Sequence, residues 1–187
     1  MNRLELLRSI KLWPTLAAIA LAAFVAVDTS DGADLAPILA ASGLVYLGAA
    51  AIHKPSSAWP LFFGTFVVIA ASKIAERLGF AGFEPTVVLL ASALGFLAFG
   101  VFTGGMRRFE EFPLQAIAMI AIGATAAIAL KLNSDVGAYL VAAGLLGHAA
   151  WDVYHHWVNR VVTRAMAEFC CVLDTLLAAA IVTMTLR

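Results

Sequence analysis

The chain has 187 residues, of which 63% are hydrophobic and 13% are charged, and its formal net charge is zero. Soluble domains are nearer half apolar and about a quarter charged. The composition therefore argues against a soluble domain and favours a polytopic membrane protein. The neutral balance, with no long basic run, also argues against nucleic acid as a partner.

Seven apolar segments follow one another along the chain and are separated by residues that favour turns or helix ends. A membrane-spanning helix needs roughly 20 residues at about 1.5 Å each. The first segment is short, so a bundle of six spanning helices is the alternative to seven. The segments are Leu12–Val27, Leu35–His53, Trp59–Leu78, Pro85–Thr103, Pro113–Leu130, Val136–Val158 and Ala165–Leu186.

The segments predict a single transmembrane helical domain over residues 1–187, because no stretch between them is long enough for a second domain. Alanine and glycine are abundant inside them, and small residues let helices pack closely in lipid. Lys and Arg are more frequent at one end of the bundle, which predicts a cytoplasmic N-terminus and a C-terminus outside. The residues at this basic end are Arg3, Arg8, Lys11, Lys54, Arg107, Arg108, Arg160 and Arg164.

Three charged residues stand at the other end of the third segment. Lys73, Glu76 and Arg77 have the i, i+3 and i+4 spacing that places side chains on one helical face. This spacing favours an ion pair at the membrane interface. A substrate-binding role is the alternative.

The sixth segment contains the stretch GHAAWDVYHHWVNR, which holds three of the four histidines in the chain. At about 100° per residue, His148, Asp152, His155 and Asn159 fall on one narrow stripe of a helix, and His156 lies on its flank. Ionisable groups at membrane depth are costly unless they are paired or hydrated, so such a stripe is a candidate functional site.

The seventh segment runs back antiparallel to the sixth and carries polar residues of its own. We expect Glu168, Cys171, Asp174 and Thr175 to share one face. Glu168 is then expected near the level of His155, and Asp174 deeper, towards His148. The last hairpin can in this way bring imidazoles and carboxylates together.

Imidazole and carboxylate are the usual ligands of zinc and iron. We predict that His148, Asp152 and His155 hold a divalent metal, since their spacing directs three side chains towards one ion. Glu168 and Asp174 are the candidate catalytic residues, as further ligands or as a general base. Three residues near the basic end, His156, Asn159 and Arg160, are candidates for binding a polar headgroup.

The leading interpretation is a metal-dependent membrane enzyme, a hydrolase or an oxidoreductase, that acts on a membrane lipid or another apolar small molecule. A proton-coupled or small-molecule transporter is one alternative. Another is a structural subunit of a larger membrane complex, or a homo-oligomer, in which the histidines and acids only pin the last hairpin together.

Two resemblances accompany this interpretation. The run from His148 to His156, followed by Ala167-Glu168-Phe169-Cys170 and Asp174, resembles the C-terminal signature of a family of small bacterial polytopic membrane proteins. That resemblance implies a bacterial inner-membrane location and no particular activity. In outline, seven helices with intramembrane His and Asp are similar to the alkaline ceramidase and adiponectin-receptor superfamily of zinc-dependent lipid amidases. That superfamily's His-x3-His pair is absent from the last segment here.

Overall fold

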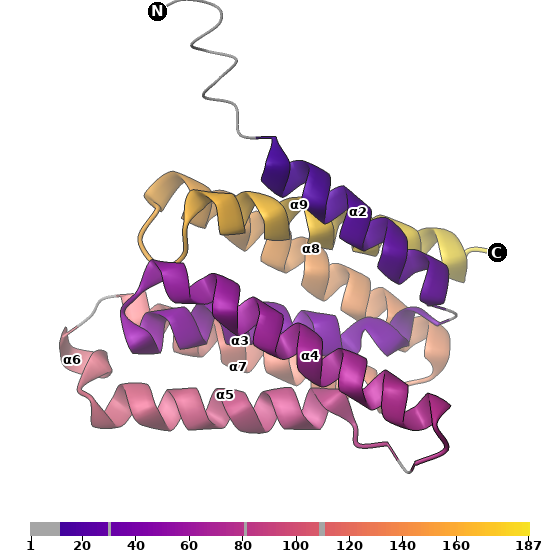
Figure 1. Cartoon of the computed structure of the whole chain (residues 1–187), viewed down its shortest axis with the longest axis horizontal. Helices are drawn as coiled ribbons and strands as arrows, with labels where there is room; N and C mark the ends of the chain where they lie inside the picture. Colours follow the sequence, from indigo (N-terminus) through magenta and orange to yellow (C-terminus); the bar gives the residue numbers. More distant parts are fainter. Residues whose placement is uncertain (1–11, 30, 81, 109–110) are drawn as a thin grey trace, which may run out of the picture.

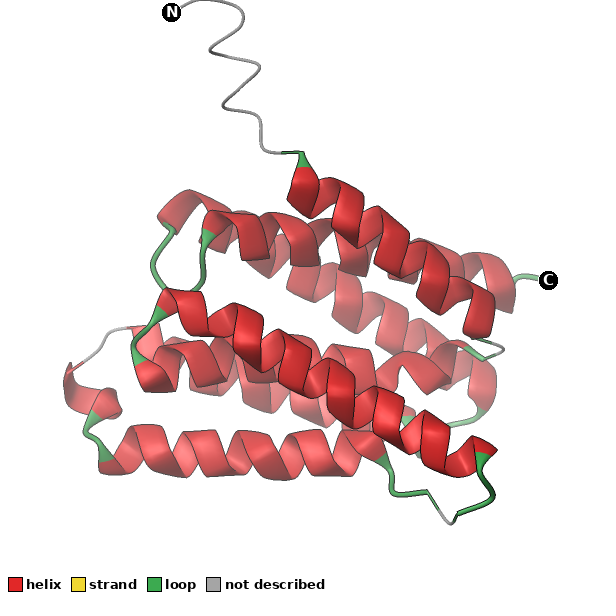
Figure 2. Cartoon of the chain, viewed as in Figure 1, coloured by secondary structure: helices red, strands yellow, loops and turns green. Residues whose placement is uncertain are grey.

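A computed structural model describes residues 12–29, 31–80, 82–108 and 111–187, which are almost entirely helical and include no strand (Figure 2). Six helices are long and apolar enough to cross a membrane, and a shorter apolar helix covers Trp13–Asp28. The prediction of an all-α membrane bundle is confirmed. Three of the basic residues used to predict its orientation, Arg3, Arg8 and Lys11, lie outside the described residues.

The helices follow the expected segments to within a few residues at each end. Two short 3₁₀ turns, η1 (Gly32–Leu35) and η2 (Pro55–Ser57), precede the first and second of the six long helices. The helices are α2 (Trp13–Asp28), α3 (Ala36–Ile52), α4 (Ala58–Arg77), α5 (Pro85–Phe102), the single turn α6 (Gly105–Arg108), α7 (Glu111–Ala129), α8 (Ser134–Val158) and α9 (Arg164–Thr185).

Helix α3 forms the centre of the bundle. In its apolar window 89% of the residues are buried, compared with 17% for α4 and 22% for α5. It packs against α4, α5, α7 and α8, while α2 covers α9 at one side of the molecule (Figure 1). A side chain that projects from α3 therefore points into protein.

Small residues set the distance between these helices. A Cβ atom on Gly144 of α8 would lie 2.5 Å from Leu39 Cδ2 of α3, and one on Gly100 of α5 would lie 2.1 Å from the ring of Phe112. Both distances are too short for a side chain unless the neighbour moves, which the end of the Leu39 side chain can do more easily than the buried ring of Phe112. The close approach of α8 to α3 brings the polar stripe of α8 against the central helix.

The last hairpin, α8 and α9, is fixed by side-chain caps. Asn133 accepts a hydrogen bond from the backbone N–H of Val136, and Thr163 accepts one from Met166. These caps satisfy N–H groups that a helix start leaves free. Asn159 ends α8 in a left-handed conformation with φ of 52°, which asparagine tolerates better than most residues.

The charged end of α4 differs from the expected ion pair within one helix. Lys73 Nζ and Arg77 Nη2 lie 3.2 and 2.6 Å from the carboxylate of Asp28, which ends α2. Their partner is therefore on a neighbouring helix. The hydrogen bond from Lys73 and the two positive charges lower the pKa of the Asp28 carboxyl from its ordinary value.

Candidate metal centre

Three buried side chains from the last hairpin meet about halfway along both helices. Nδ1 of His148 lies 2.8 Å from Oδ2 of Asp174 and 3.3 Å from Oδ2 of Asp152. Each of the three residues is at most 1% exposed. One ligand atom from each lies within 4.8 Å of the other two, so the group can hold a metal ion.

These spacings fit those of metal ligands. A tetrahedral ion about 2.0–2.1 Å from each ligand keeps its ligand atoms about 3.3 Å apart. The two His148 distances are close to that value, so an ion needs only small side-chain shifts to enter. An imidazole with two carboxylates is a donor set that zinc, iron and manganese accept.

The central helix, α3, contributes a hydrogen bond to one of the acids, Asp152. Tyr46 of α3 donates a hydrogen bond from its hydroxyl to Oδ1 of Asp152. Its ring lies 5.0 Å, centroid to centroid, from the ring of His148, at an interplanar angle of 89°. Tyr46 is 2% exposed, so water does not compete for this contact. The tyrosine fixes the carboxylate and leaves its other oxygen towards His148.

His155 lies beside this group and has different partners. Its Nε2 is 3.0 Å from Nε2 of Gln115 on α7, whose Oε1 accepts a hydrogen bond from the indole N–H of Trp151 at 3.2 Å. The Tyr46 ring is 5.1 Å from the His155 ring. Of the three predicted ligands, the structure brings His148 and Asp152 together, and Asp174 takes the third place instead of His155.

Several buried polar atoms of the site make no hydrogen bond within the described residues. They are Nε2 of His148, Oδ2 of Asp152 and Nδ1 of His155. An unsatisfied buried polar atom costs about 1–3 kcal/mol, more when it is charged. Two of these atoms belong to residues of the group that can hold a metal ion, and the third belongs to His155 beside it.

The net charge of the buried group depends on what it binds. Two carboxylates and one imidazolium carry a net charge of −1, whereas two carboxylates, a neutral imidazole and a divalent cation are neutral. A net charge at this depth is unfavourable. A divalent ion neutralises the group, and so does one further proton on the two carboxylates.

Glu168 lies apart from the group. Its Oε1 accepts a hydrogen bond from Thr15 of α2 at 2.6 Å, and the residue is half-buried. The expected common face of Glu168 and Asp174 was wrong, because six residues at 100° each place the two about 120° apart around α9. The buried face of α9 carries Asp174 and Cys170 instead, and Thr175 is exposed.

The three predicted headgroup residues stay at the end of α8, away from the buried group. His156 is half-buried, and Asn159 is the residue that ends the helix. Arg160 is exposed, with Nη1 3.4 Å from Oε1 of Glu111 on α7. Arg160 therefore pairs with Glu111 at the start of a neighbouring helix.

The sequence interpretation missed two residues that contact the site, Tyr46 and Gln115. Each is a polar side chain in an otherwise apolar segment, and each is nearly fully buried. The signal was available, since a polar group in a spanning helix is expected to find a hydrogen-bonding partner there.

The fold and this site define a polytopic α-helical membrane protein with a buried His/Asp group that can hold a metal ion. No family model matches the chain, and no curated protein or solved structure matches it either.

Proposed function

We propose that the protein is a metal-dependent membrane enzyme whose centre is formed by His148, Asp152 and Asp174. The observation that carries the proposal is the position of His148 Nδ1, 2.8 and 3.3 Å from two buried aspartate oxygens on two helices. A purely structural pair needs one acid. Two acids against one imidazole suit a cation.

The ligand count supports catalysis over a structural role. Structural zinc sites are closed by four protein ligands, whereas catalytic ones use three and leave a position for water or substrate. The group has three. A bound ion would supply Lewis acidity or a bound hydroxide, and Tyr46 would hold Asp152 in place, as partners of ligands commonly do.

The surroundings support an apolar substrate. Two cavities have a residue of the group in their lining. One lies between α2, α3, α4 and α9 and includes Asp174, and the other lies between α7 and α8 and includes His148. Both are lined mainly by apolar side chains. A lipid or another apolar molecule is therefore the substrate class that can approach the centre from within a bilayer.

Metal analysis of the purified protein tests the proposal. After exposure to zinc, iron(II) or manganese and removal of free ions, we expect about one ion per chain, as for other three-ligand centres. His148→Gln should lose it. His156→Gln is the matched control, a histidine on the same helix outside the group, and should retain it. Equal metal content in both variants, or none in the unchanged protein, contradicts the proposal.

A further inference from the structure

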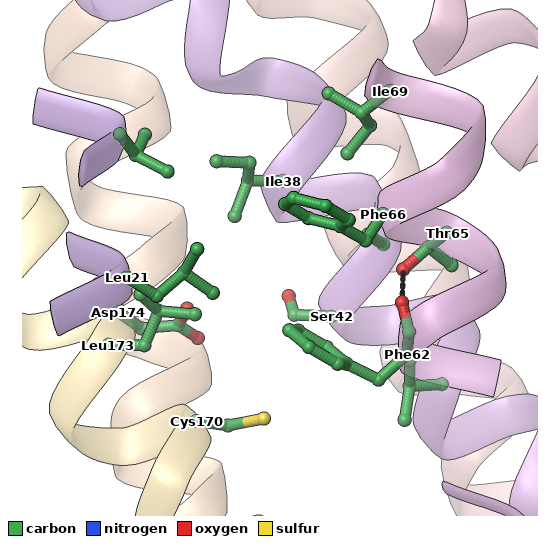
Figure 3. Close-up of a pocket in the computed structure, with 13 residues that line it drawn as sticks. Leu21, Ile38, Ser42, Phe62, Thr65, Phe66, Ile69, Cys170, Leu173 and Asp174 are labelled. Carbon is green, nitrogen blue, oxygen red and sulfur yellow. Dashed lines mark hydrogen bonds between the residues drawn. The ribbon is translucent and has the colours of Figure 1, made fainter. Parts of the chain in front are cut away.

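The cavity beside Asp174 is an apolar crevice that leads out of the bundle interior. The cavity has a volume of about 80 Å³ and is lined by residues of α2, α3, α4 and α9, among them Leu21, Ile38 and Phe62 (Figure 3). Cys170 and Ser42 face the same space as Asp174. Asp174, a residue of the proposed metal centre, therefore lines the inner end of the crevice.

The lining offers water almost nothing to bind. The hydroxyl of Ser42 donates to the carbonyl of Leu39, and that of Thr65 donates to the carbonyl of Phe62. Both are thus satisfied by their own helices. With its hydroxyls engaged in this way, the narrow space suits an alkyl chain better than water or a polar ligand.

A second cavity, about 230 Å³, continues the crevice along α4. Val25, Ile38, Phe66 and Ile69 line both cavities, so the two are contiguous. The far end of the second cavity is charged, with two acids and two bases. These are Asp28, Asp34, Lys73 and Arg77.

The length and the charges of the crevice match one leaflet of a bilayer. From Phe62 to Lys73, where the charged mouth begins, the crevice follows α4 for roughly 16 Å at 1.5 Å per residue, close to the roughly 15 Å of hydrocarbon in one leaflet. Its apolar part ends near the middle of the bundle, and its charged mouth lies where a headgroup would be. The mouth carries both acids and bases, which suits a zwitterionic headgroup.

We propose that this crevice binds one acyl chain of a zwitterionic phospholipid, with the headgroup at Asp28, Lys73 and Arg77 and the chain extending towards Asp174. The inference rests on the proposed function in one respect: it names the substrate class of that centre. The groove between α7 and α8 is larger, about 370 Å³, but none of its lining residues is an acid, a lysine or an arginine. It lacks a place for a headgroup and serves as the comparison.

Photo-crosslinking tests the proposal. The probe is phosphatidylcholine with a diazirine on one acyl chain, reconstituted with the full chain in phosphatidylcholine vesicles. We expect adducts concentrated on crevice residues such as Val25, Ile38 and Cys170. Adducts that follow exposure alone, with Phe63 and Val67 on the outer face of α4 labelled as strongly, overturn it. The proposal is also overturned if a free fatty acid with the same diazirine labels the crevice and the phosphatidylcholine probe does not.

Blocking variants sharpen the test. Val25→Trp places a ring at the junction of the two cavities. It should lower crevice adducts about tenfold, the effect of about 1.4 kcal/mol of lost binding free energy. Ile69→Trp is a second blocking variant in case the first does not fold. Gly147→Phe fills the α7–α8 groove, where an added Cβ meets nothing within 4 Å, and should leave the adducts unchanged. Unchanged adducts in both folded tryptophan variants overturn the inference.

Metal content measured on the same samples separates the two proposals. Crevice adducts on a protein that binds no metal contradict the proposed function and leave the lipid site standing. One metal per chain without crevice adducts contradicts only the lipid site.

Discussion

The molecule contains two clusters in which carboxylates meet basic side chains, and they differ in burial. His148, Asp152 and Asp174 are sealed in the bundle, with polar atoms left unsatisfied. Asp28, Lys73 and Arg77 join helix ends at the surface, where side-chain exposure is 40% or more. Water can replace any partner in the second cluster but none in the first. Carboxylates beside basic side chains therefore form an ion pair between helix ends in the exposed cluster and a candidate metal centre in the buried one.

The largest expected effect comes from removing an acid of the buried cluster. Asp152→Ala leaves the Tyr46 hydroxyl without its acceptor and removes one of the two carboxylates beside His148. Removing one partner of a buried charged pair costs about 3–5 kcal/mol. Denaturant unfolding in detergent measures the loss. Asp135→Ala, an exposed acid in the first turn of α8, is the control. If both variants unfold alike, the buried cluster is not held together as described.

Metal removal is expected to have the next largest effect. An ion that binds only the folded chain stabilises it by about 2.7 kcal/mol when present at about 100 times its Kd. A chelator should therefore lower the unfolding temperature of the unchanged protein and leave that of His148→Gln as it was. An equal response of the two proteins would attribute the effect to some other site.

Tyr46→Phe probes the support of the cluster from α3. The loss of a hydrogen bond to a charged group costs about 1.5–3 kcal/mol, and loss of a ligand's partner commonly lowers metal affinity about 10–100-fold. Metal titration and unfolding should both report it. Tyr139→Phe, at a tyrosine that is 42% exposed, should change neither. Unchanged metal affinity in Tyr46→Phe would mean that the hydrogen bond to Asp152 does not contribute to metal binding.

Glu168→Gln distinguishes the two faces of α9. The carboxylate accepts from Thr15, and the amide oxygen that replaces it is a weaker, uncharged acceptor. We therefore expect a loss of at most about 0.5–1.5 kcal/mol, with the metal retained. Thr15→Val should have a similar effect, and the double variant should lose little more. Loss of metal in Glu168→Gln alone would restore Glu168 as a member of the centre.

The smallest effect is expected at the exposed cluster. Since the pKa of Asp28 is lowered in the folded chain, its contribution to stability is present above the unfolded pKa and is lost as pH falls through the folded pKa. Asp28→Asn should therefore lower the unfolding temperature slightly at neutral pH and not in strong acid, and high salt should remove the difference. A difference that persists in acid would contradict the ion-pair origin.

The sequence was sufficient to predict the bundle, because long apolar segments separated by turn residues leave few other structures in lipid. It also identified His148, Asp152 and Asp174, which are ionisable groups in spanning segments. The pairing of Lys73 and Arg77 with Asp28 could not be read from spacing, since it depends on where α2 lies. The contact of Tyr46 with Asp152 depends likewise on which face α3 turns to α8. Side-chain periodicity gives the face of a helix but not its neighbour.

The enclosure of α3 has a consequence for biosynthesis. Four of the helices that surround it, α4, α5, α7 and α8, follow it in the chain and are made later. Before these helices are inserted, α3 must lie in lipid, although in the complete fold it is surrounded by protein. Its mean hydropathy of 1.9 is high enough for such a stage. Tyr46 lies on the same helix, and its hydroxyl has no contact with Asp152 until α8 is inserted. The site is therefore completed only near the end of synthesis.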